Sequence, residues 1–182
     1  MIGNCIETRS PFGIVMSREV AIEQVGCGAQ VTEILKRFPT GEFDIMTVGM
    51  ERFRVIEVSR EKSYLEGMVE FFMDDPKTSS DYGMSGKVDL LEEIFQLCYR
   101  LLKSDAKVEK IRTFANSHSG EPSFLLANHL GFGLDFQQSM LQMTDECERL
   151  SLMIETLVQI VGPESALASK GFIEGQTWFN VN

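Results

Sequence analysis

The sequence predicts a segregated α+β protein in which a small β lobe precedes a helical lobe. Apolar residues alternate with polar ones in the first half of the chain, and beyond the polar stretch 77–85 they recur at the 3.6-residue period of helices. All strand segments come before the helical segments, so the chain lacks the βαβ alternation of a parallel sheet. We expect a β lobe at residues 1–76, a linker at 77–85, and a helical lobe with a C-terminal tail at 86–182.

Short apolar segments bounded by turn residues predict the strands of the β lobe. Glycines within such segments, as at Gly26 and Gly28, indicate bulges or close backbone approach. Pro39-Thr40-Gly41 predicts a hairpin turn, because Pro fixes φ and Gly accepts a positive φ, and Gly49 indicates a turn or a bulge. The predicted strands span residues 11–16, 25–35, 34–38 paired with 43–48, 52–58, and 64–73.

The first two predicted helices are located by an apolar stripe and by a helix-start signal. The first carries its stripe between Leu91 and Leu102. The second begins at Glu121-Pro122, because Pro suits the first helical turn, and it ends at Gly131.

Two more helices are expected near the end of the helical lobe. Asp135 followed by Gln138 indicates a variant capping box that opens the third helix. The fourth spans residues 144–161, and we expect the carboxylates of its segment Asp145-Glu146-x-Glu148 on a solvated face or at the helix N-terminus. Its apolar stripe comprises Cys147, Leu150, Met153, Ile154, Leu157, Val158 and Val161.

Charge and hydropathy argue against nucleic acid and membrane as partners. A formal charge of −10, from 17 basic and 27 acidic residues, disfavours binding to a phosphate backbone. The nearest approach to a basic cluster is Arg52-Phe53-Arg54, where alternation predicts two solvent-facing arginines around a buried Phe. There is no apolar run of about 18 residues that could span a membrane, and no secretory signal is recognisable. We expect a cytoplasmic protein that binds neither nucleic acid nor membrane.

No residue is predicted to act in catalysis or to hold a cofactor or a metal ion. The four cysteines are far apart and the two histidines lack the spacing of zinc ligands, so reduced thiols are expected. A phosphate-binding G-x-x-x-x-G-K-[ST] loop is absent, and Gly131-Phe132-Gly133 is better explained as helix punctuation. His118 could pair with Cys98 or a serine, but no nucleophile elbow or acidic orienter supports this. His129 is expected to be a hydrogen-bonded helix residue.

Several motifs, in this order along the chain, resemble the N-terminal substrate-binding domain of Lon-type proteases. The resemblance covers about residues 2–160, and it implies a PUA-like β lobe, a helical lobe and a non-catalytic role in binding polypeptides. The motifs are Pro-Phe-Gly-Ile-Val-Met at 11–16, Val-Gly-Cys-Gly-Ala-Gln-Val at 25–31, the segment 43–55 containing Gly-Met-Glu-Arg-Phe-Arg, Tyr-Leu-Glu-Gly-Met-Val at 64–69, and Thr-Asp-Glu-Cys-Glu-Arg-Leu at 144–150.

The resemblance also implies that the β lobe is incomplete. Family members begin with a Pro- and Leu-rich pair of strands and then a helix, and residues 1–7 resemble the end of that helix. Without the opening strands, a PUA-like barrel exposes a strand edge and part of its apolar interior. We therefore expect poor solubility, or self-association through the exposed edge.

Three functions compete at this point. The first is a binding module, resembling the Lon substrate-recognition domain, that engages unfolded or exposed apolar polypeptide segments by apolar contact and strand addition. The alternative is a scaffold or adaptor for one folded protein partner, and the third is a small hydrolase that uses His118. No individual binding residue is predicted, because Met50, Phe71 and Phe72 have the spacing of core residues. The pair Trp178-Phe179 in the tail is expected to dock on the body of the protein.

Overall fold

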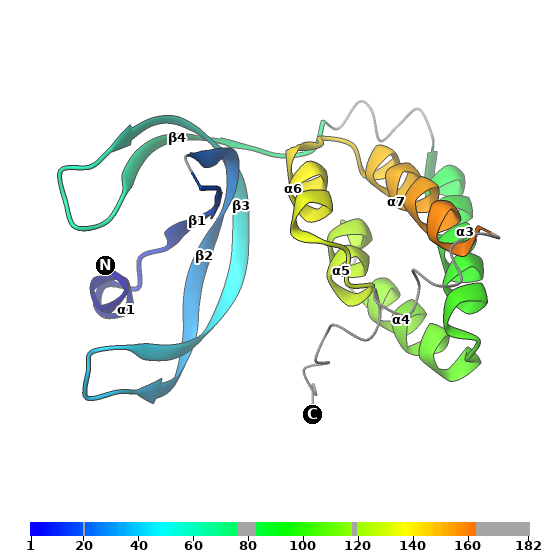
Figure 1. Cartoon of the computed structure of the whole chain (residues 1–182), viewed down its shortest axis with the longest axis horizontal. Helices are drawn as coiled ribbons and strands as arrows, with labels where there is room; N and C mark the ends of the chain where they lie inside the picture. Colours follow the sequence, from blue (N-terminus) through cyan, green and yellow to red (C-terminus); the bar gives the residue numbers. More distant parts are fainter. Residues whose placement is uncertain (20, 76–82, 118–119, 163–182) are drawn as a thin grey trace. The chain divides into compact units, whose positions relative to one another are not determined.

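The computed structural model (Figure 1) describes residues 1–19, 21–75, 83–117 and 120–162. It contains a β unit, Met1–Met73, and a helical unit that begins at Asp74 and extends to Asn182. An antiparallel sheet precedes the main group of helices, so the predicted α+β class is confirmed. The predicted tail with Trp178 and Phe179, the residue His118, and positions 77–82 of the predicted linker lie outside the described residues.

The β unit starts with a short helix, α1 (Ile2–Thr8), which leads into a four-stranded antiparallel sheet. Arg9 closes α1 in a left-handed conformation, with φ of 54°. The strands lie side by side in sequence order and are β1 (Phe12–Ser17), β2 (Ile22–Arg37), β3 (Phe43–Ser59) and β4 (Glu66–Phe72).

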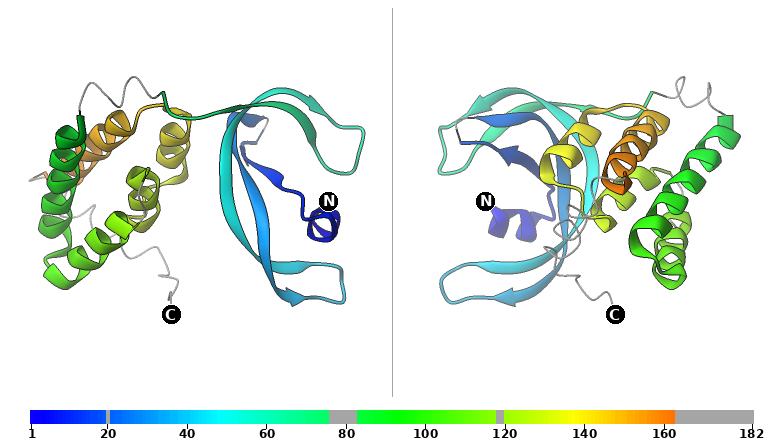
Figure 2. Two further views of the ribbon diagram at one scale, coloured as in Figure 1. Left: turned by 180° about the vertical axis from the view of Figure 1, so that it is seen from behind. Right: turned by 45° about the vertical axis from the view of Figure 1, so that its right-hand side comes forward.

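β2 and β3 are longer than predicted, because segments expected to be separate strands run together. The predicted turn between them is present, with Gly41 at a φ of 92°. Gly49 does not interrupt β3. Gly49 pairs with Ala29 and Arg52 pairs with Cys27, so β3 has two residues between these pairs where β2 has one. Gly49 therefore lies beside a bulge, as one of the two predicted alternatives states, and not in a turn. Bulges of this kind bend strands, and Figure 2 shows the resulting curvature of β2 and β3.

The prediction that Arg52 faces solvent is wrong. Arg52 is only 6% exposed, whereas Arg54 is exposed as expected and Phe53 is buried. The strand register places Phe72 of β4 opposite Arg52. Both guanidinium groups lie over the Phe72 ring, at 4.8 Å for Arg52 and 4.1 Å for Arg54. A planar, weakly hydrated guanidinium can stack on an aromatic face in this way.

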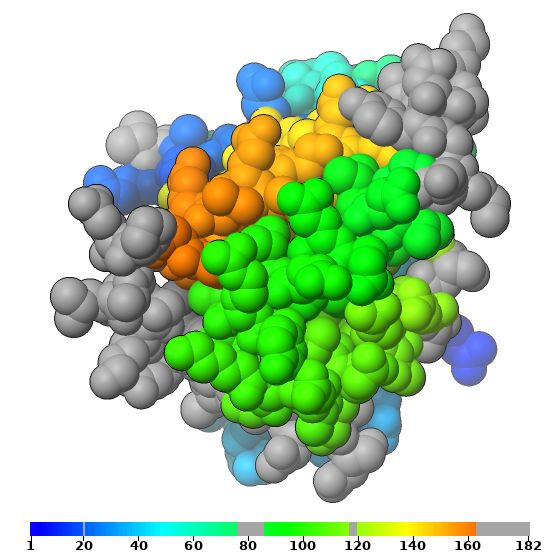
Figure 3. Space-filling view, turned by 90° about the vertical axis from the view of Figure 1, so that its right-hand side faces the viewer, coloured from blue at the N-terminus to red at the C-terminus, as the bar shows by residue number. Residues whose placement is uncertain are grey.

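The helical unit is built around a pair of packed helices, α3 (Gly83–Leu102) and α7 (Glu146–Val161). Figure 3 shows them side by side on one face of the unit. The other helices are α4 (Asp105–Ser117), α5 (Pro122–His129) and α6 (Leu134–Gln142). The buried core comprises Ile94, Phe95, Leu97, Cys98, Val108, Ile111, Ala115, Leu126, Ala127, Phe132, Met140, Leu150, Met153 and Leu157.

Three details of the helices differ from the sequence expectations. The pattern predicts no helix at α4, whose buried residues Val108, Ile111 and Ala115 stand among charged ones. α6 takes Gly133 as its N-cap, so Asp135 lies in the first turn and the predicted capping box is wrong. In the stripe of α7, Val158 is exposed.

The three carboxylates at the start of α7 differ in their exposure. Asp145 is the N-cap, and its Oδ1 accepts a hydrogen bond from the Glu148 N–H at 2.8 Å, as a residue at the helix N-terminus should. However, both Asp145 and Glu146 are buried. Only Glu148 is exposed, whereas Asp145 and Glu146 follow the helix N-terminus alternative and are withdrawn from solvent.

The reason is Arg149, which is 0% exposed and surrounded by acceptors. Its Nη1 donates to Asp74 Oδ1 at 2.8 Å and to the Met143 carbonyl at 3.0 Å. Its Nη2 donates to Glu146 Oε2 at 2.7 Å, and its Nε donates to Ser123 Oγ at 2.9 Å. Burial alone would lower the pKa of Arg149, but Asp74 and Glu146 outweigh it and keep that pKa above the ordinary value. We call these residues the Arg149 cluster.

Candidate functional site

The site begins with a row of residues that crosses all four strands of the β unit. The register pairs Val15 of β1 with Gly26 of β2, Gly26 with Phe53 of β3, and Phe53 with Phe71 of β4. Residues directly opposite one another on neighbouring strands point to the same face of a sheet. The row therefore defines one face, which we call the inner face.

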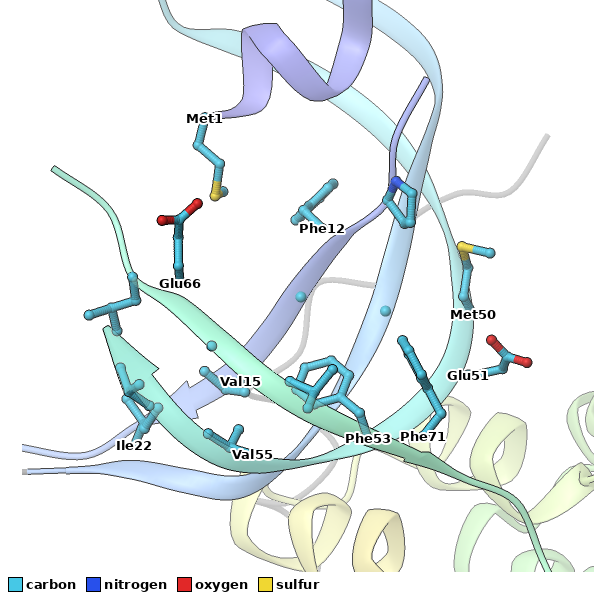
Figure 4. Close-up of a pocket in the computed structure, with 17 residues that line it drawn as sticks. Met1, Phe12, Val15, Ile22, Met50, Glu51, Phe53, Val55, Glu66 and Phe71 are labelled. Carbon is cyan, nitrogen blue, oxygen red and sulfur yellow. The ribbon is translucent and has the colours of Figure 1, made fainter. Parts of the chain in front are cut away.

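The inner face lines an apolar groove of about 290 Å³. Side chains from Met1, which precedes α1, from each of the strands and from the segment that leads into β4 contribute to it, as Figure 4 shows for the principal ones. The apolar lining residues include Met1, Phe12, Val15, Ile22, Met50, Phe53, Val55, Val58, Leu65, Val69 and Phe71.

Phe53 forms the floor of the groove because glycines face it. A Cβ placed at Gly13 would meet the Phe53 ring at 3.0 Å, and one placed at Gly26 would meet it at 2.8 Å. Phe53 is consequently 5% exposed, and its ring meets Phe71 edge to face at a centroid distance of 6.3 Å. The close backbone approach that the strand glycines indicate in the sequence is realised at Gly26.

We expect Gly26→Ala to lower the free energy of unfolding by about 1–3 kcal/mol, the cost of forcing extra volume into a packed site. The added Cβ would lie 2.5 Å from the backbone oxygen of Ile14 and 2.6 Å from Val15 Cγ1, so β1 would have to shift. Urea denaturation followed by circular dichroism measures this loss.

Gly49→Ala is the matched control in the same sheet. A Cβ there meets only Cys27 Sγ, at 3.9 Å. The free energy of unfolding of this variant should be unchanged or higher by up to about 1 kcal/mol, because Ala lowers the conformational entropy of the unfolded chain. Equal stabilities for the two variants would contradict the close packing at Gly26.

The only charged side chains that line the groove are those of two glutamates. Figure 4 shows Glu66 beside Met1 at one end and Glu51 beside Met50 at the other. Glu66 is paired with Lys62, whose Nζ lies 2.7 Å from Glu66 Oε1. Glu51 forms no ion pair with any residue in the described ranges. The groove therefore favours apolar ligands and, at its Glu51 end, a cation.

The prediction that Met50, Phe71 and Phe72 belong to the core is wrong for the first two. Met50 is 44% exposed and Phe71 is 59% exposed, and both line the groove. Phe72 is half-buried on the opposite face, beneath Arg52 and Arg54. Alternation identifies residues that share a face, but it cannot show whether another layer covers that face. The alternation of apolar and polar residues therefore could not predict that the inner face is uncovered.

Among the described residues considered for chemistry, none lines the groove, and His118 lies outside the described residues. Cys98 is completely buried in the helical core, and burial raises its pKa to about 12, so its thiol stays protonated at neutral pH. His129 stacks on Phe114 at a centroid distance of 4.0 Å, and its Nδ1 has no hydrogen-bond partner among the described atoms. Gly131 and Gly133 flank a buried Phe132 between α5 and α6.

Metal binding and membrane spanning can both be judged within the described ranges. No group of three or more His, Cys, Asp or Glu side chains there could hold a metal ion. No helix in those ranges is long and apolar enough to cross a membrane.

Comparison with known proteins gives consistent matches. Residues 1–159 match the family model of the ATP-dependent protease La (LON) substrate-binding domain. Lon protease 2 of Myxococcus xanthus is 26% identical over 170 residues, which cover 86% of this chain and 20% of that protein. The chain thus spans about a fifth of the length of this curated relative.

Two solved structures share the fold. The Lon N-terminal domain protein from Xanthomonas campestris superposes with a TM-score of 0.57 at 18% identity, over 85% of this chain and 80% of that one. The N-terminal domain of the Mycobacterium avium complex Lon protease gives a TM-score of 0.57 at 16% identity, over 81% and 77% respectively.

Proposed function

Because the chain belongs to the family of the substrate-binding domain of the ATP-dependent protease La (LON), we propose that it is a non-catalytic binding module for exposed apolar segments of polypeptides. The observation that carries this proposal is the open apolar groove on the inner face of the β unit. Exposed apolar surface of this kind marks interaction sites in soluble proteins. Unfolded polypeptides are ligands that present apolar side chains without a fixed tertiary structure.

The size of the groove sets the expected affinity. An apolar cavity of about 150 Å³ holds a benzene molecule, so a groove of about 290 Å³ has room for about two large side chains. Burying each side chain contributes about 1.5–3 kcal/mol before the costs of association are subtracted. Side-chain burial alone therefore supports weak binding, which suits a module that samples many polypeptides.

The acidic charge supports polypeptide over nucleic acid as the partner, since a net charge of −10 repels phosphates. We include a cytoplasmic location in the proposal. All four cysteines are free and three of them are buried, as is usual in a reducing compartment.

Binding of fluorescently labelled unfolded casein, measured by anisotropy, tests the proposal. The chain should bind casein, and Phe71→Asp should weaken binding at least about tenfold, because it places a charge on the groove wall at the cost of an apolar contact. Phe71 is already 59% exposed, so the fold should tolerate the change.

The matched control is Met68→Asp, which adds the same charge to the same strand. Met68 is 64% exposed and lies on the outer face of β4, away from the groove. This variant should bind casein like the parent. Loss of binding in both variants, or in neither, would show that the groove is not the binding site. If the parent chain does not bind casein, the proposed function is wrong.

A further inference from the structure

The outer edge of β1 is available for pairing with another strand. β1 stands at the end of the strand order, and β2 is its only strand partner within the ranges that the structure describes. In an edge strand, every second residue directs its N–H and C=O away from the sheet. Those groups hydrogen-bond to water unless another strand is added.

The two edges of the sheet differ in their protection. Proteins commonly protect edges with charged residues or proline, which discourage strand pairing. β4 carries Glu66 and Glu70, whereas β1 (Phe-Gly-Ile-Val-Met-Ser) contains neither a charged residue nor a proline. The β1 edge is therefore the one that admits an extended polypeptide.

The same strand also lines the groove. Phe12, Gly13 and Val15 of β1 are lining residues, so a strand paired beside β1 would lie about 4.8 Å further out and direct alternate side chains over the inner face. Residues i and i+2 of that strand would share the apolar space. The residue between them would point away from the groove.

The negative charge of Glu51 at one end of the groove favours ligands with a basic residue. Of the two glutamates that line the groove, Glu66 is paired with Lys62, and Glu51 forms no ion pair within the described ranges. A basic ligand residue near Glu51 would gain an ion pair, and an acidic one would be repelled.

We propose that the ligand binds as an added β-strand on the outer edge of β1, with apolar side chains at i and i+2 in the groove and a flanking Lys or Arg beside Glu51. This inference rests on the proposed function and specifies its ligand. The occupant is an extended, basic-flanked apolar segment of another polypeptide. Main-chain hydrogen bonds to β1 supply affinity that does not depend on the ligand sequence. The groove selects ligands in which apolar residues stand at alternate positions.

Synthetic peptides test the strand pairing. The probe is a labelled Lys-Thr-Phe-Ser-Val-Thr-Lys peptide, compared with two versions N-methylated either at the Ser or at the adjacent Val. In an added strand only one of these two N–H groups faces β1. One N-methylated peptide should therefore lose affinity at least about tenfold and the other should stay within about twofold of the parent peptide. Equal affinities for the two would overturn the proposal.

A charge exchange tests the role of Glu51. Replacing both Lys residues of the peptide by Glu should weaken binding about three- to fivefold, the scale of an exposed ion pair. Glu51→Gln should remove that difference. Glu57→Gln, an equal charge change at an exposed position of β3 that does not line the groove, should preserve it.

The outcomes separate this inference from the function on which it rests. If casein binds through Phe71 but the peptides fail to bind, or bind regardless of N-methylation, strand addition is wrong and the binding function stands. If casein itself does not bind, the function fails. If sedimentation shows a dimer of the chain that the parent peptide dissociates, a second copy occupies the edge, and the proposed occupant is wrong.

Discussion

Replacing Arg149 by Met is expected to lower the free energy of unfolding of the helical unit by about 3–5 kcal/mol. Met roughly preserves the apolar volume of the side chain, so the loss reports the charge and its hydrogen bonds. Without the guanidinium, the buried Glu146 and the partly buried Asp74 lose their common partner. An uncompensated carboxylate in that position must either stay charged at a high cost or take up a proton.

Urea denaturation followed by helical circular dichroism measures the effect. Arg112→Met is the matched control, because Arg112 also pairs with a carboxylate, Glu92 at 2.7 Å, but at a partly exposed position. Solvent screens such a pair, so Arg112→Met should change the urea midpoint of unfolding only slightly. If Arg149→Met is no more destabilising than the control, the Arg149 cluster has no special role in stability.

Replacing Phe53 by Ala is expected to destabilise the β unit by about 3–5 kcal/mol, the usual cost of removing a buried aromatic side chain. Phe53, at 5% exposure, is the largest of the few buried apolar residues among the described residues of this unit. Its ring covers Gly13 and Gly26, which have no side chains with which to fill the space it would leave. The variant would also lose the edge-to-face contact with Phe71.

Amide hydrogen exchange of β2 and β3, measured by mass spectrometry, detects this change locally as faster exchange. Phe71→Ala is the control, because it removes the same type of side chain from the same cross-strand pair at an exposed position. It should leave exchange in β2 nearly unchanged. Unaltered exchange in Phe53→Ala would contradict the central packing role of Phe53.

The sequence predicted the order and type of most elements, because apolar spacing reports locally which face of a strand or helix is buried. It failed where burial depends on distant residues. Glu146 and Arg149 look like ordinary helix charges until Asp74, 75 positions before Arg149, closes the cluster. Arg52 is similar, since its burial over Phe72 follows from the register of β3 with β4. α4 escaped prediction because its apolar stripe is interrupted by lysines and a glutamate.

The candidate site was predictable only in part. The glycines at positions 26 and 28 indicated close backbone approach, and this is realised against Phe53 at Gly26. The row from Val15 to Phe71 joins four segments whose register is fixed by bulges. Bulge positions depend on pairing between strands, so a single-strand pattern could not place Phe71 on a groove wall.

The order of the strands also has a consequence for folding kinetics. β2 and β3 are consecutive and joined by a tight turn, so their hairpin can form on a timescale of about 1–10 μs. β1 and β4 can then add only at the two sides of that hairpin. Since both outer strands line the groove, a partly folded chain holding only the hairpin has no groove. Competence to bind is therefore expected to arise at the end of folding of the β unit, which keeps an unfinished chain from capturing its own unfolded segments.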